Sequence, residues 1–448
     1  MISMSRRPSL RIADPLLRSA YSLVANAAIT AGLGVVFWVV AARLYEPGEV
    51  GRDAALIAVM LELSAICQLN MVNAITRFLP SLERGTARAL LRAYALSASA
   101  AAVIGLAFVV GVPRISDEFS FLSEDWRISA LYVIGLVAWG WFALEDAALT
   151  AVRRAPWIPI ENGVFGVLKL AALPLFAAIG IQHGVFLAWT LPAVLLIVPV
   201  NLLLFRVAIP EHLRRQRPAG SAVLRRLGPR GLVRFMAQDY AATVLAVAPT
   251  ALLPVLIVGL LGSGANAYFY VPYTMVGAFT TLFFAAGMSL VAEGALAEDQ
   301  VRAMAGRIAR RVALILIPGT VFMIVAAPLI LLPFGDDYVR ESSSVLRLLA
   351  CGCGFSAVLV LYVAIARLQG HPGRILAVEA TKLPLLLGGV IVFSGPLGID
   401  GVAVAWLGSV AAVALAVTPW LLRFLRAPAS SEPAHRSIPP MPTRAPLR

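Results

Sequence analysis

Twelve apolar runs of about 20 residues, separated by short polar segments, constrain this chain more than any other feature of its sequence. The runs start near residues 20, 54, 88, 128, 157, 183, 231, 265, 308, 345, 374 and 399. A helix of about 20 apolar residues crosses the roughly 30 Å hydrocarbon layer of a membrane and satisfies its own backbone hydrogen bonds there. The sequence therefore predicts an all-α integral membrane protein with twelve transmembrane helices.

The composition excludes a water-soluble globular protein. Hydrophobic residues make up 60% of the chain and charged residues 14%, whereas soluble domains carry about 25% charged residues. The net charge of +13 does not indicate a nucleic-acid partner. The excess is spread over predicted inner loops, which face anionic lipid headgroups, and it forms no single basic domain.

The placement of arginine predicts the orientation. If the N-terminus is cytoplasmic, the inner segments hold 29 arginines and the outer loops hold six. Positively charged residues concentrate on the cytoplasmic side of membrane proteins. We therefore expect both termini to lie in the cytoplasm. The six outer arginines are Arg43, Arg52, Arg114, Arg127, Arg340 and Arg347.

A short sequence occurs twice, 217 residues apart. Residues 184–189 read GVFLAW and residues 401–406 read GVAVAW, and a Gly-Ile pair precedes each copy. Each copy lies just before the last apolar run of its half. Repeated halves are typical of transporters whose site lies between the repeats. This pattern predicts two six-helix lobes related by a pseudo-twofold axis along the membrane normal.

These observations divide the chain into five parts, with the first span retained as a signal anchor. The parts are a basic cytoplasmic arm (1–19), an N-lobe with helices one to six (20–205), a cytoplasmic linker (206–230), a C-lobe with helices seven to twelve (231–424) and a Pro-rich cytoplasmic tail (425–448).

Polar residues within the spans are candidates for function, because a charge at mid-helix costs about 2.5 to 3.5 kcal/mol on insertion scales. Glu62, Asn70, Asn73 and Arg77 in span two are spaced to share one face of a continuous helix. They predict a polar stripe that lines a wet cavity. For the asparagines, hydrogen bonding between helices is an equally open alternative.

The two lysines of the chain, Lys169 and Lys382, lie in spans five and eleven. Glu379 precedes Lys382 by three residues, a spacing that permits an ion pair on one helical face. Glu161 precedes Lys169 by eight residues, or about 12 Å along the axis, so these two should not pair. Lys382 is therefore structural or extends to the cytoplasmic interface, whereas Lys169 needs another partner.

Aromatic side chains cluster at the start of span eight. Such residues form an interfacial belt by default, and stacking on sugar rings is the alternative. The cluster consists of Tyr268, Phe269, Tyr270 and Tyr273.

Signatures of several enzyme and metal-site classes are missing. There is no Gly-rich phosphate loop, no His-Glu-x-x-His and no Cys-x-x-Cys. The three cysteines fall within spans and predict no disulfide framework and no metal site. We expect no cofactor and no catalytic residues. Three acids of the first outer loop would suit a membrane glycosyltransferase, but solvated loop acids are the simpler interpretation: Glu46, Glu49 and Asp53.

Three segments are similar to patterns of the Wzx-type polysaccharide and O-antigen flippases, which belong to the multidrug/oligosaccharidyl-lipid/polysaccharide (MATE-like) superfamily. The segments are YEPGEVG at 45–51, RFLP at 77–80 and LLPFGDDY at 331–338. The resemblance covers residues 15 to 425, and its motifs are more specific to the superfamily than to one substrate.

The resemblance implies a V-shaped transporter of the bacterial cytoplasmic membrane with a central cationic cavity and alternating access. It implies that the cargo is a polyprenyl-pyrophosphate-linked glycan, moved from the inner to the outer leaflet for cell-surface polysaccharide biosynthesis. Glycosyltransferases or a glycan polymerase are the expected partners, together with membrane lipids.

The residues can be assigned to parts of such a cargo. Arg77, Arg234 and Lys169 would bind the pyrophosphate, because cations near the inner leaflet suit it. Asparagine amides on spans one and two would hydrogen-bond sugar hydroxyls: Asn26, Asn70 and Asn73.

Coupling to an ion gradient needs a titratable or cation-binding acid within the membrane. Glu62 is the first candidate, because it has no ion-pair partner within four residues, and Asp239 is the second. Glu161 and Glu379 remain open. A small-molecule or drug antiporter is the main alternative function. Drug-extruding relatives often carry an acid in span one, where this chain offers Asn26, and lipid II flippases usually carry two further spans.

Overall fold

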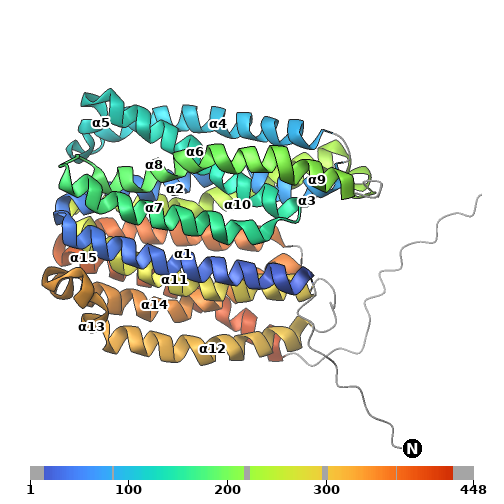
Figure 1. Cartoon of the computed structure of the whole chain (residues 1–448). Helices are drawn as coiled ribbons and strands as arrows, with labels where there is room; N and C mark the ends of the chain where they lie inside the picture. Colours follow the sequence, from blue (N-terminus) through green and yellow to red (C-terminus); the bar gives the residue numbers. More distant parts are fainter. Residues whose placement is uncertain (1–14, 83–84, 216–221, 295–300, 370, 427–448) are drawn as a thin grey trace, which may run out of the picture.

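A computed structural model of the chain describes residues 15–82, 85–215, 222–294, 301–369 and 371–426. These residues form helices and short connections, with no β-strand among them. Figure 1 shows the long helices lying side by side in one bundle, with short helices at its two ends. The prediction of an all-α membrane fold is confirmed.

The first half of the chain contributes six long helices and three short α-helices within the described residues. The long helices are α1 (Pro15–Leu44), α2 (Pro47–Cys67), α4 (Thr86–Gly111), α6 (Trp126–Ala151), α7 (Ile158–Ala178) and α8 (Gly184–Leu203). The short ones are α3 (Met71–Phe78), α5 (Phe121–Glu124) and α9 (Ile209–Arg215).

The second half contributes α10 (Ala222–Leu261), α11 (Ser263–Gly294), α12 (Val301–Val325), α13 (Ala327–Leu331), α14 (Asp336–Leu368) and α15 (Pro372–Arg426). Helix α15 is interrupted at Gly398, whose φ of 57° and ψ of −135° are not helical. It therefore consists of two arms that cross the bundle separately. The second half, like the first, supplies six long segments.

Eight helices of the described residues are long and apolar enough to cross a membrane. Helix α15 counts once among them although Gly398 divides it. Helix α2 is not among the eight because Arg52, Asp53 and Glu62 make it more polar. Helix α1 is not among them either, because only its part Thr30–Leu44 counts, as a shorter apolar helix. With these helices, α11 and the second arm of α15, the long segments agree with the twelve predicted crossings.

The predicted outer loops gather at one end of the bundle, which we call the α5/α13 end (Figure 1). Contacts within this end join loops that are distant in sequence: Arg43 Nε donates to the Pro333 carbonyl at 2.7 Å, and Ser344 Oγ lies 2.6 Å from a carboxylate oxygen of Asp400. Helices α3 and α9 mark the opposite end, which we call the α3/α9 end.

The repeated sequence marks the same structural step in each half. Gly180 and Gly398 both have left-handed backbones, with φ of 65° and 57°. Glycine adopts this conformation without the Cβ clash that other residues meet. A Cβ on Gly184 would lie 2.6 Å from the Tyr45 hydroxyl, and one on Gly401 would lie 2.0 Å from the Phe393 carbonyl oxygen. The repeat therefore preserves a turn and a close approach before the last helix of each half.

Helix α2 lies at the centre of the bundle. Its residues Ala54 to Met60 are all buried, so no face of this stretch is exposed. It packs against α6 and α8 of the first half and against α10 and α11 of the second. A helix that is apolar on every face is typical of such a central position. Helix α2 thus belongs to the cores of both halves.

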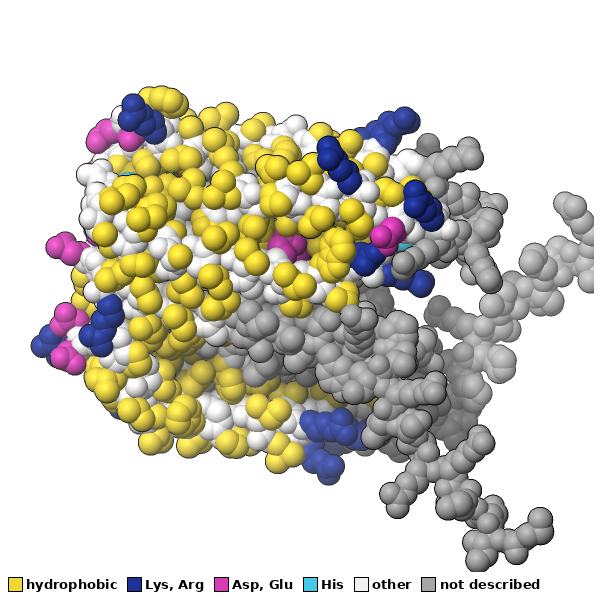
Figure 2. Space-filling model, in the orientation of Figure 1, with side chains coloured by type: hydrophobic (Ala, Val, Ile, Leu, Met, Phe, Trp, Pro, Cys, Tyr) yellow, Lys and Arg dark blue, Asp and Glu magenta, His cyan; other side chains and the backbone are white. Residues whose placement is uncertain are grey.

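The outer surface of the bundle carries large apolar side chains that face no other part of the described protein. On α12, Leu314 is 69% exposed and Val325 is 73% exposed. Figure 2 shows hydrophobic side chains over the middle of the visible face, with most charged side chains toward the two ends. This distribution matches a hydrocarbon layer around the middle of the bundle.

The polar stripe predicted along span two is interrupted. Helix α2 ends at Cys67 and α3 starts at Met71, because Leu69 and Asn70 adopt left-handed conformations with φ of 49° and 61°. Glu62 and Asn73 therefore lie on different helices and share no helical face. The prediction of a continuous stripe is wrong, since spacing in sequence assumes an unbroken helix. The Tyr240 hydroxyl of α10 donates to the Ile66 carbonyl beside the break, at 3.0 Å.

We expect Gly51→Ala to weaken the contact between α2 and α11. The new Cβ would lie 1.8 Å from the Ser263 carbonyl oxygen and 2.7 Å from the Ala267 backbone nitrogen, so the helices must separate. Overpacking of this kind costs about 1 to 3 kcal/mol. Thermal unfolding of the purified protein in detergent measures the loss.

Gly48→Ala is the matched control, because its Cβ would meet the Ser263 hydroxyl at an ordinary 3.5 Å. Equal melting temperatures for the two variants would contradict the close approach at Gly51.

Candidate functional site

A cavity of about 360 Å³ lies between α2 of the first half and the helices of the second half. We call it the interhalf cavity. Among the described residues of its wall, Glu62 of α2 is the charged one, and hydroxyl groups of threonine and tyrosine supply most of the other polar side-chain atoms. Its lining comprises Ala58, Leu61, Glu62, Thr250, Tyr270, Tyr273, Thr274, Val276, Gly277, Thr280 and Trp406.

A second cavity of about 380 Å³ lies within the second half, among α10, α11, α14 and both arms of α15. We call it the second-half cavity. It shares Thr250, Tyr273 and Trp406 with the interhalf cavity, so the two adjoin. The charged residues in its described lining are Arg367, Glu379 and Lys382. Arg367 stands near the last residue of α14, so the cavity extends toward the α3/α9 end.

Glu379 and Lys382 form the ion pair that their three-residue spacing permits, with Nζ 2.5 Å from a carboxylate oxygen. The two side chains are 13% and 20% exposed, and both line the second-half cavity. The sequence left open whether Lys382 is structural or extends to the cytoplasmic interface. The structure adds that it faces a space large enough for a ligand.

The aromatic cluster of span eight packs inside the protein, with Phe269 and Tyr270 buried and Tyr268 and Tyr273 partly buried. Tyr270 and Tyr273 line the interhalf cavity, and Phe269 is fully buried. Tyr268 packs on Tyr338 with ring centroids 5.0 Å apart. The expectation of an interfacial belt is therefore wrong, because α11 packs in the interior against α2 and α14. Two of the phenols are placed where a ligand in the cavity would meet them.

Lys169 is enclosed by aromatic rings inside the first half. Its side chain is 2% exposed, and Nζ lies 3.6 Å from the centroid of Trp189. The rings of Phe165 and Phe37 follow at 5.0 and 5.1 Å. These cation–π contacts are the partners that the sequence left open, since an ammonium is attracted to the negative face of an aromatic ring. Lys169 lines neither cavity, so direct contact with a ligand would require these rings to move.

Two buried carboxylates lie together in the first half, Glu145 of α6 and Glu161 of α7. Glu145 is fully buried and Glu161 is 7% exposed. Asn201 donates to one oxygen of Glu145 and accepts a hydrogen bond from the Tyr94 hydroxyl at 3.0 Å. Within the described structure, the other Glu145 oxygen and both Glu161 oxygens have no hydrogen-bond partner.

Two neighbouring carboxylates in a medium of low dielectric do not both stay ionised without a cation. The pair is therefore suited to hold a proton or a cation. Glu161 does not pair with Lys169, in agreement with their spacing. Sequence reasoning missed Glu145, although an acid within an apolar span was a usable signal.

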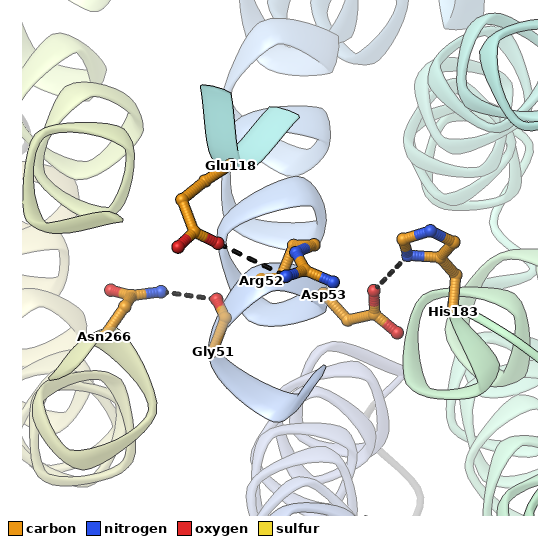
Figure 3. Close-up of polar contacts among 6 residues, drawn as sticks. All are labelled: Gly51, Arg52, Asp53, Glu118, His183 and Asn266. Atoms are coloured by element: carbon orange, nitrogen blue, oxygen red, sulfur yellow. Dashed lines mark hydrogen bonds and ion pairs between the residues drawn. The ribbon is translucent and has the colours of Figure 1, made fainter. Parts of the chain in front are cut away.

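Polar contacts link α2 to neighbouring elements at the α5/α13 end (Figure 3). Arg52 reaches Glu118 at 3.2 Å on one side of α2, and Asp53 reaches His183 Nδ1 at 2.9 Å on the other. Asn266 of α11 donates to the Gly51 carbonyl at 2.7 Å. Because Asn266 belongs to the second half and Gly51 to the first, this bond joins the two halves.

Asp53 is 1% exposed, and its second oxygen accepts a hydrogen bond from the Phe186 backbone at 3.0 Å. The interpretation of Asp53 as a solvated loop acid is wrong, because this acid anchors the start of α8. Nearby, the Tyr45 hydroxyl donates to the Leu173 carbonyl at 2.8 Å. Burial and the charges of Asp53 and Glu49 raise the pKa of Tyr45 to about 12, so it remains a donor at neutral pH.

Apart from Lys169, the structure describes the side chains of two predicted ligand-binding residues, Asn70 and Asn73. Asn73 Nδ2 donates to Asn70 Oδ1 at 2.6 Å, and these two residues lie at the break between α2 and α3. Neither lines the two cavities. The remaining predicted side chains lie outside the described residues: Asn26, Arg77, Arg234 and Asp239.

Solved structures of membrane transporters share this arrangement of helices. Lipid II flippase MurJ in an inward closed conformation aligns over 91% of this chain and 90% of its own, with a TM-score of 0.62 and 14% identity. An inward-facing multidrug resistance MATE transporter aligns over 94% and 98%, with a TM-score of 0.57 and 16% identity. This chain has the fold of the MOP-superfamily transporters.

A third structure with this fold is a MOP-superfamily transporter from Pyrococcus furiosus whose binding pocket is described as having reverse polarity. It aligns over 92% of this chain and 95% of its own, with a TM-score of 0.55 and 14% identity. No family model and no curated protein matches the chain. At these identities the likeness concerns the fold, and the substrate must be argued from the cavities of this chain.

We expect Asp53→Asn to destabilise the protein. One carboxylate oxygen accepts from Phe186 and the other lies against His183, whereas an amide presents one oxygen and one NH₂ group. An unsatisfied buried donor costs about 1 to 3 kcal/mol. Thermal unfolding in detergent measures the effect, and the exposed Asp117→Asn at the same end is the control. Identical melting curves for both variants would contradict an anchoring role for Asp53.

Proposed function

We propose that this protein moves a polyprenyl-pyrophosphate-linked oligosaccharide from the cytoplasmic to the outer leaflet by alternating access. The product would serve cell-surface polysaccharide biosynthesis, together with glycosyltransferases or a glycan polymerase. Lipid II flippase MurJ is one of the proteins with this fold, which supports a lipid-linked cargo. In this proposal the protein resides in the bacterial cytoplasmic membrane with both termini inside.

The observation that carries the proposal is the joined pair of cavities. The interhalf cavity offers hydroxyl groups and tyrosine rings, which suit sugars. The second-half cavity offers apolar walls with Arg367 and Lys382, which suit an anionic lipid headgroup. A lipid-linked oligosaccharide has both kinds of surface. The two cavities together are therefore complementary to its polar and anionic parts.

Contacts between the halves at the α5/α13 end support alternating access. Asn266 and the Arg43 contact to the Pro333 carbonyl join the two halves there. Both contacts use backbone carbonyls and few side chains, so they would break without exposing a buried charge. Opening of this end would release the cargo to the outer leaflet if the α5/α13 end faces outward, as the arginine distribution predicts.

The residues assigned from the sequence keep their places in the proposal. Arg77 and Arg234 would attract the pyrophosphate at the α3/α9 end, and Asn70 and Asn73 would contact sugar hydroxyls as the break between α2 and α3 moves. Asn26 would act similarly from α1. Lys169 would contribute only in a state in which its aromatic enclosure opens.

Proteoliposomes containing the purified protein test this function. We expect faster flipping of a fluorescent polyprenyl-pyrophosphate oligosaccharide than in empty liposomes, and loss of at least tenfold in the Arg77→Gln/Arg234→Gln variant. Arg114→Gln, an exposed outer residue, is the matched control. Flipping equal to empty liposomes by correctly folded protein would overturn the proposal.

One observation favours a cationic small molecule as a second candidate substrate. Glu62 is the charged residue in the described lining of the interhalf cavity, and a carboxylate among aromatic rings suits an organic cation. Export of a fluorescent cationic dye, lost in Glu62→Gln, would establish this alternative. If the protein flips the glycolipid but does not export such dyes, this alternative is excluded.

We propose two acidic sites for coupling to an ion gradient, Glu62 and the Glu145–Glu161 pair; Asp239 remains a further candidate. We expect flipping by Glu161→Gln to become insensitive to an imposed proton gradient, because the amide carries no exchangeable charge. Flipping is measured with proton and sodium gradients imposed separately, and the exposed Glu124→Gln is the control. Full gradient dependence in both Glu62→Gln and Glu161→Gln would assign coupling to another residue.

A further inference from the structure

The described lining of the second-half cavity brings two cationic side chains together. It includes a guanidinium, an ammonium and several hydroxyl groups, with Glu379 as the one carboxylate among the described residues. A guanidinium carries five N–H donors and an ammonium three, and neither accepts a hydrogen bond. Such a lining favours a ligand with many acceptor oxygens and few donors. Phosphate and diphosphate groups have this property.

The two adjoining cavities differ in the cations among their described lining residues. Arg367 and Lys382 line the second-half cavity, whereas the described lining of the interhalf cavity contains no cation. Interactions between charges are stronger here than in water because apolar walls surround them. An anionic group that reaches the shared wall at Trp406 is therefore attracted toward Lys382.

In the ion pair, the carboxylate of Glu379 occupies the position beside Lys382 that an anionic ligand would take. Lys382 Nζ lies 2.5 Å from Glu379, three residues earlier on the same helix arm. Lys382 stands ten residues after the start of α15, about 15 Å into the bundle from the α3/α9 end. A carboxylate carries one negative charge, whereas a diphosphate carries more and offers more oxygens. A diphosphate can therefore displace Glu379 from the ammonium.

The walls of this cavity are mainly apolar. Leu359, Val360 and Val363 of α14 face Leu386 and Val410 of the two arms of α15. A volume of about 380 Å³ falls in the range of small-molecule sites, roughly 300 to 1,000 Å³. A cavity with apolar walls and clustered cations fits a diphosphate that carries a hydrocarbon chain better than it fits a free inorganic ion.

We propose that Lys382 and Arg367 bind the diphosphate of a prenyl-type lipid in the second-half cavity, with Glu379 as the counter-ion of Lys382 in the empty site. This inference rests on the proposed function and assigns the headgroup to residues that differ from the three cations chosen from sequence. Binding exchanges one partner of Lys382 for another, so the lysine stays paired in both states.

Calorimetric titration of the full-length protein in detergent tests the assignment, with farnesyl pyrophosphate as the probe. We expect Lys382→Gln to weaken binding at least tenfold because it removes the displaced cation. We expect Glu379→Gln to tighten binding severalfold, because the ligand no longer competes with a carboxylate. Opposite effects of two partners of one ion pair are not expected from a purely structural pair.

Arg374→Gln is the matched control. Arg374 lies on the same arm of α15 but stacks on Trp420 at 4.8 Å and bonds to Gln369, outside the cavity lining. Its neutralisation should leave affinity unchanged. Equal affinities for Lys382→Gln and Arg374→Gln would overturn the assignment.

A second variant separates binding from folding. Glu379→Leu/Lys382→Met replaces the pair by apolar side chains, a change that is often neutral or stabilising for buried ion pairs. We expect a melting temperature close to that of the unmodified protein and a loss of farnesyl pyrophosphate binding of at least tenfold. Retained binding in this folded variant would overturn the proposal.

Two further probes identify the source of the phosphate. Inorganic pyrophosphate should bind at least tenfold more weakly than farnesyl pyrophosphate, and farnesol should not compete. Equal affinity for inorganic pyrophosphate would overturn the lipid assignment in favour of a free anion. Flipping that is unaffected in Lys382→Gln would refute this inference alone, whereas Lys382-dependent binding without flipping would refute the proposed function alone.

Discussion

The packing of α2 against both halves of the chain is the contact on which the rest of the structure depends. Residues Ala54 to Met60 are buried on every face, and Gly51 allows the backbone of α11 to approach without a side chain between them. Asn266 adds a hydrogen bond across this contact. Since both cavities adjoin helices that pack on α2, movement of this one helix would change their shape and their access together.

The two lysines show that the spacing between an acid and a lysine on one helix determines whether they can pair. At three residues, Glu379 reaches Lys382 on the same face, and the pair lines a cavity. At eight residues, Glu161 is beyond reach of Lys169, so the ammonium packs among rings and the carboxylate faces Glu145 instead. The first half thus keeps its ionisable groups apart in its core, whereas the second half has an ion pair in the wall of a ligand-sized cavity.

The sequence predicted part of the candidate site. Glu62 lines the interhalf cavity as expected, and the Glu379–Lys382 pair forms as its spacing permitted. The continuous stripe failed because helical periodicity carries no sign of the left-handed step at Leu69 and Asn70. Asp53 and Tyr270 were assigned to water or to the membrane interface, since burial depends on which helices pack around them. That packing is a long-range property that local pattern does not contain.

The sequence by itself determined the membrane class and the order of the long helices, because hydrophobic run length is a local property. The Gly-Ile repeat indicated where the last helix of each half begins, and both glycines are left-handed there. Only the tertiary structure decided which polar groups face a cavity, which face each other and which are enclosed by rings. Those outcomes depend on the rotation of each helix about its axis and on breaks in the helices. A shift of one residue along a helix turns a side chain toward a different neighbour.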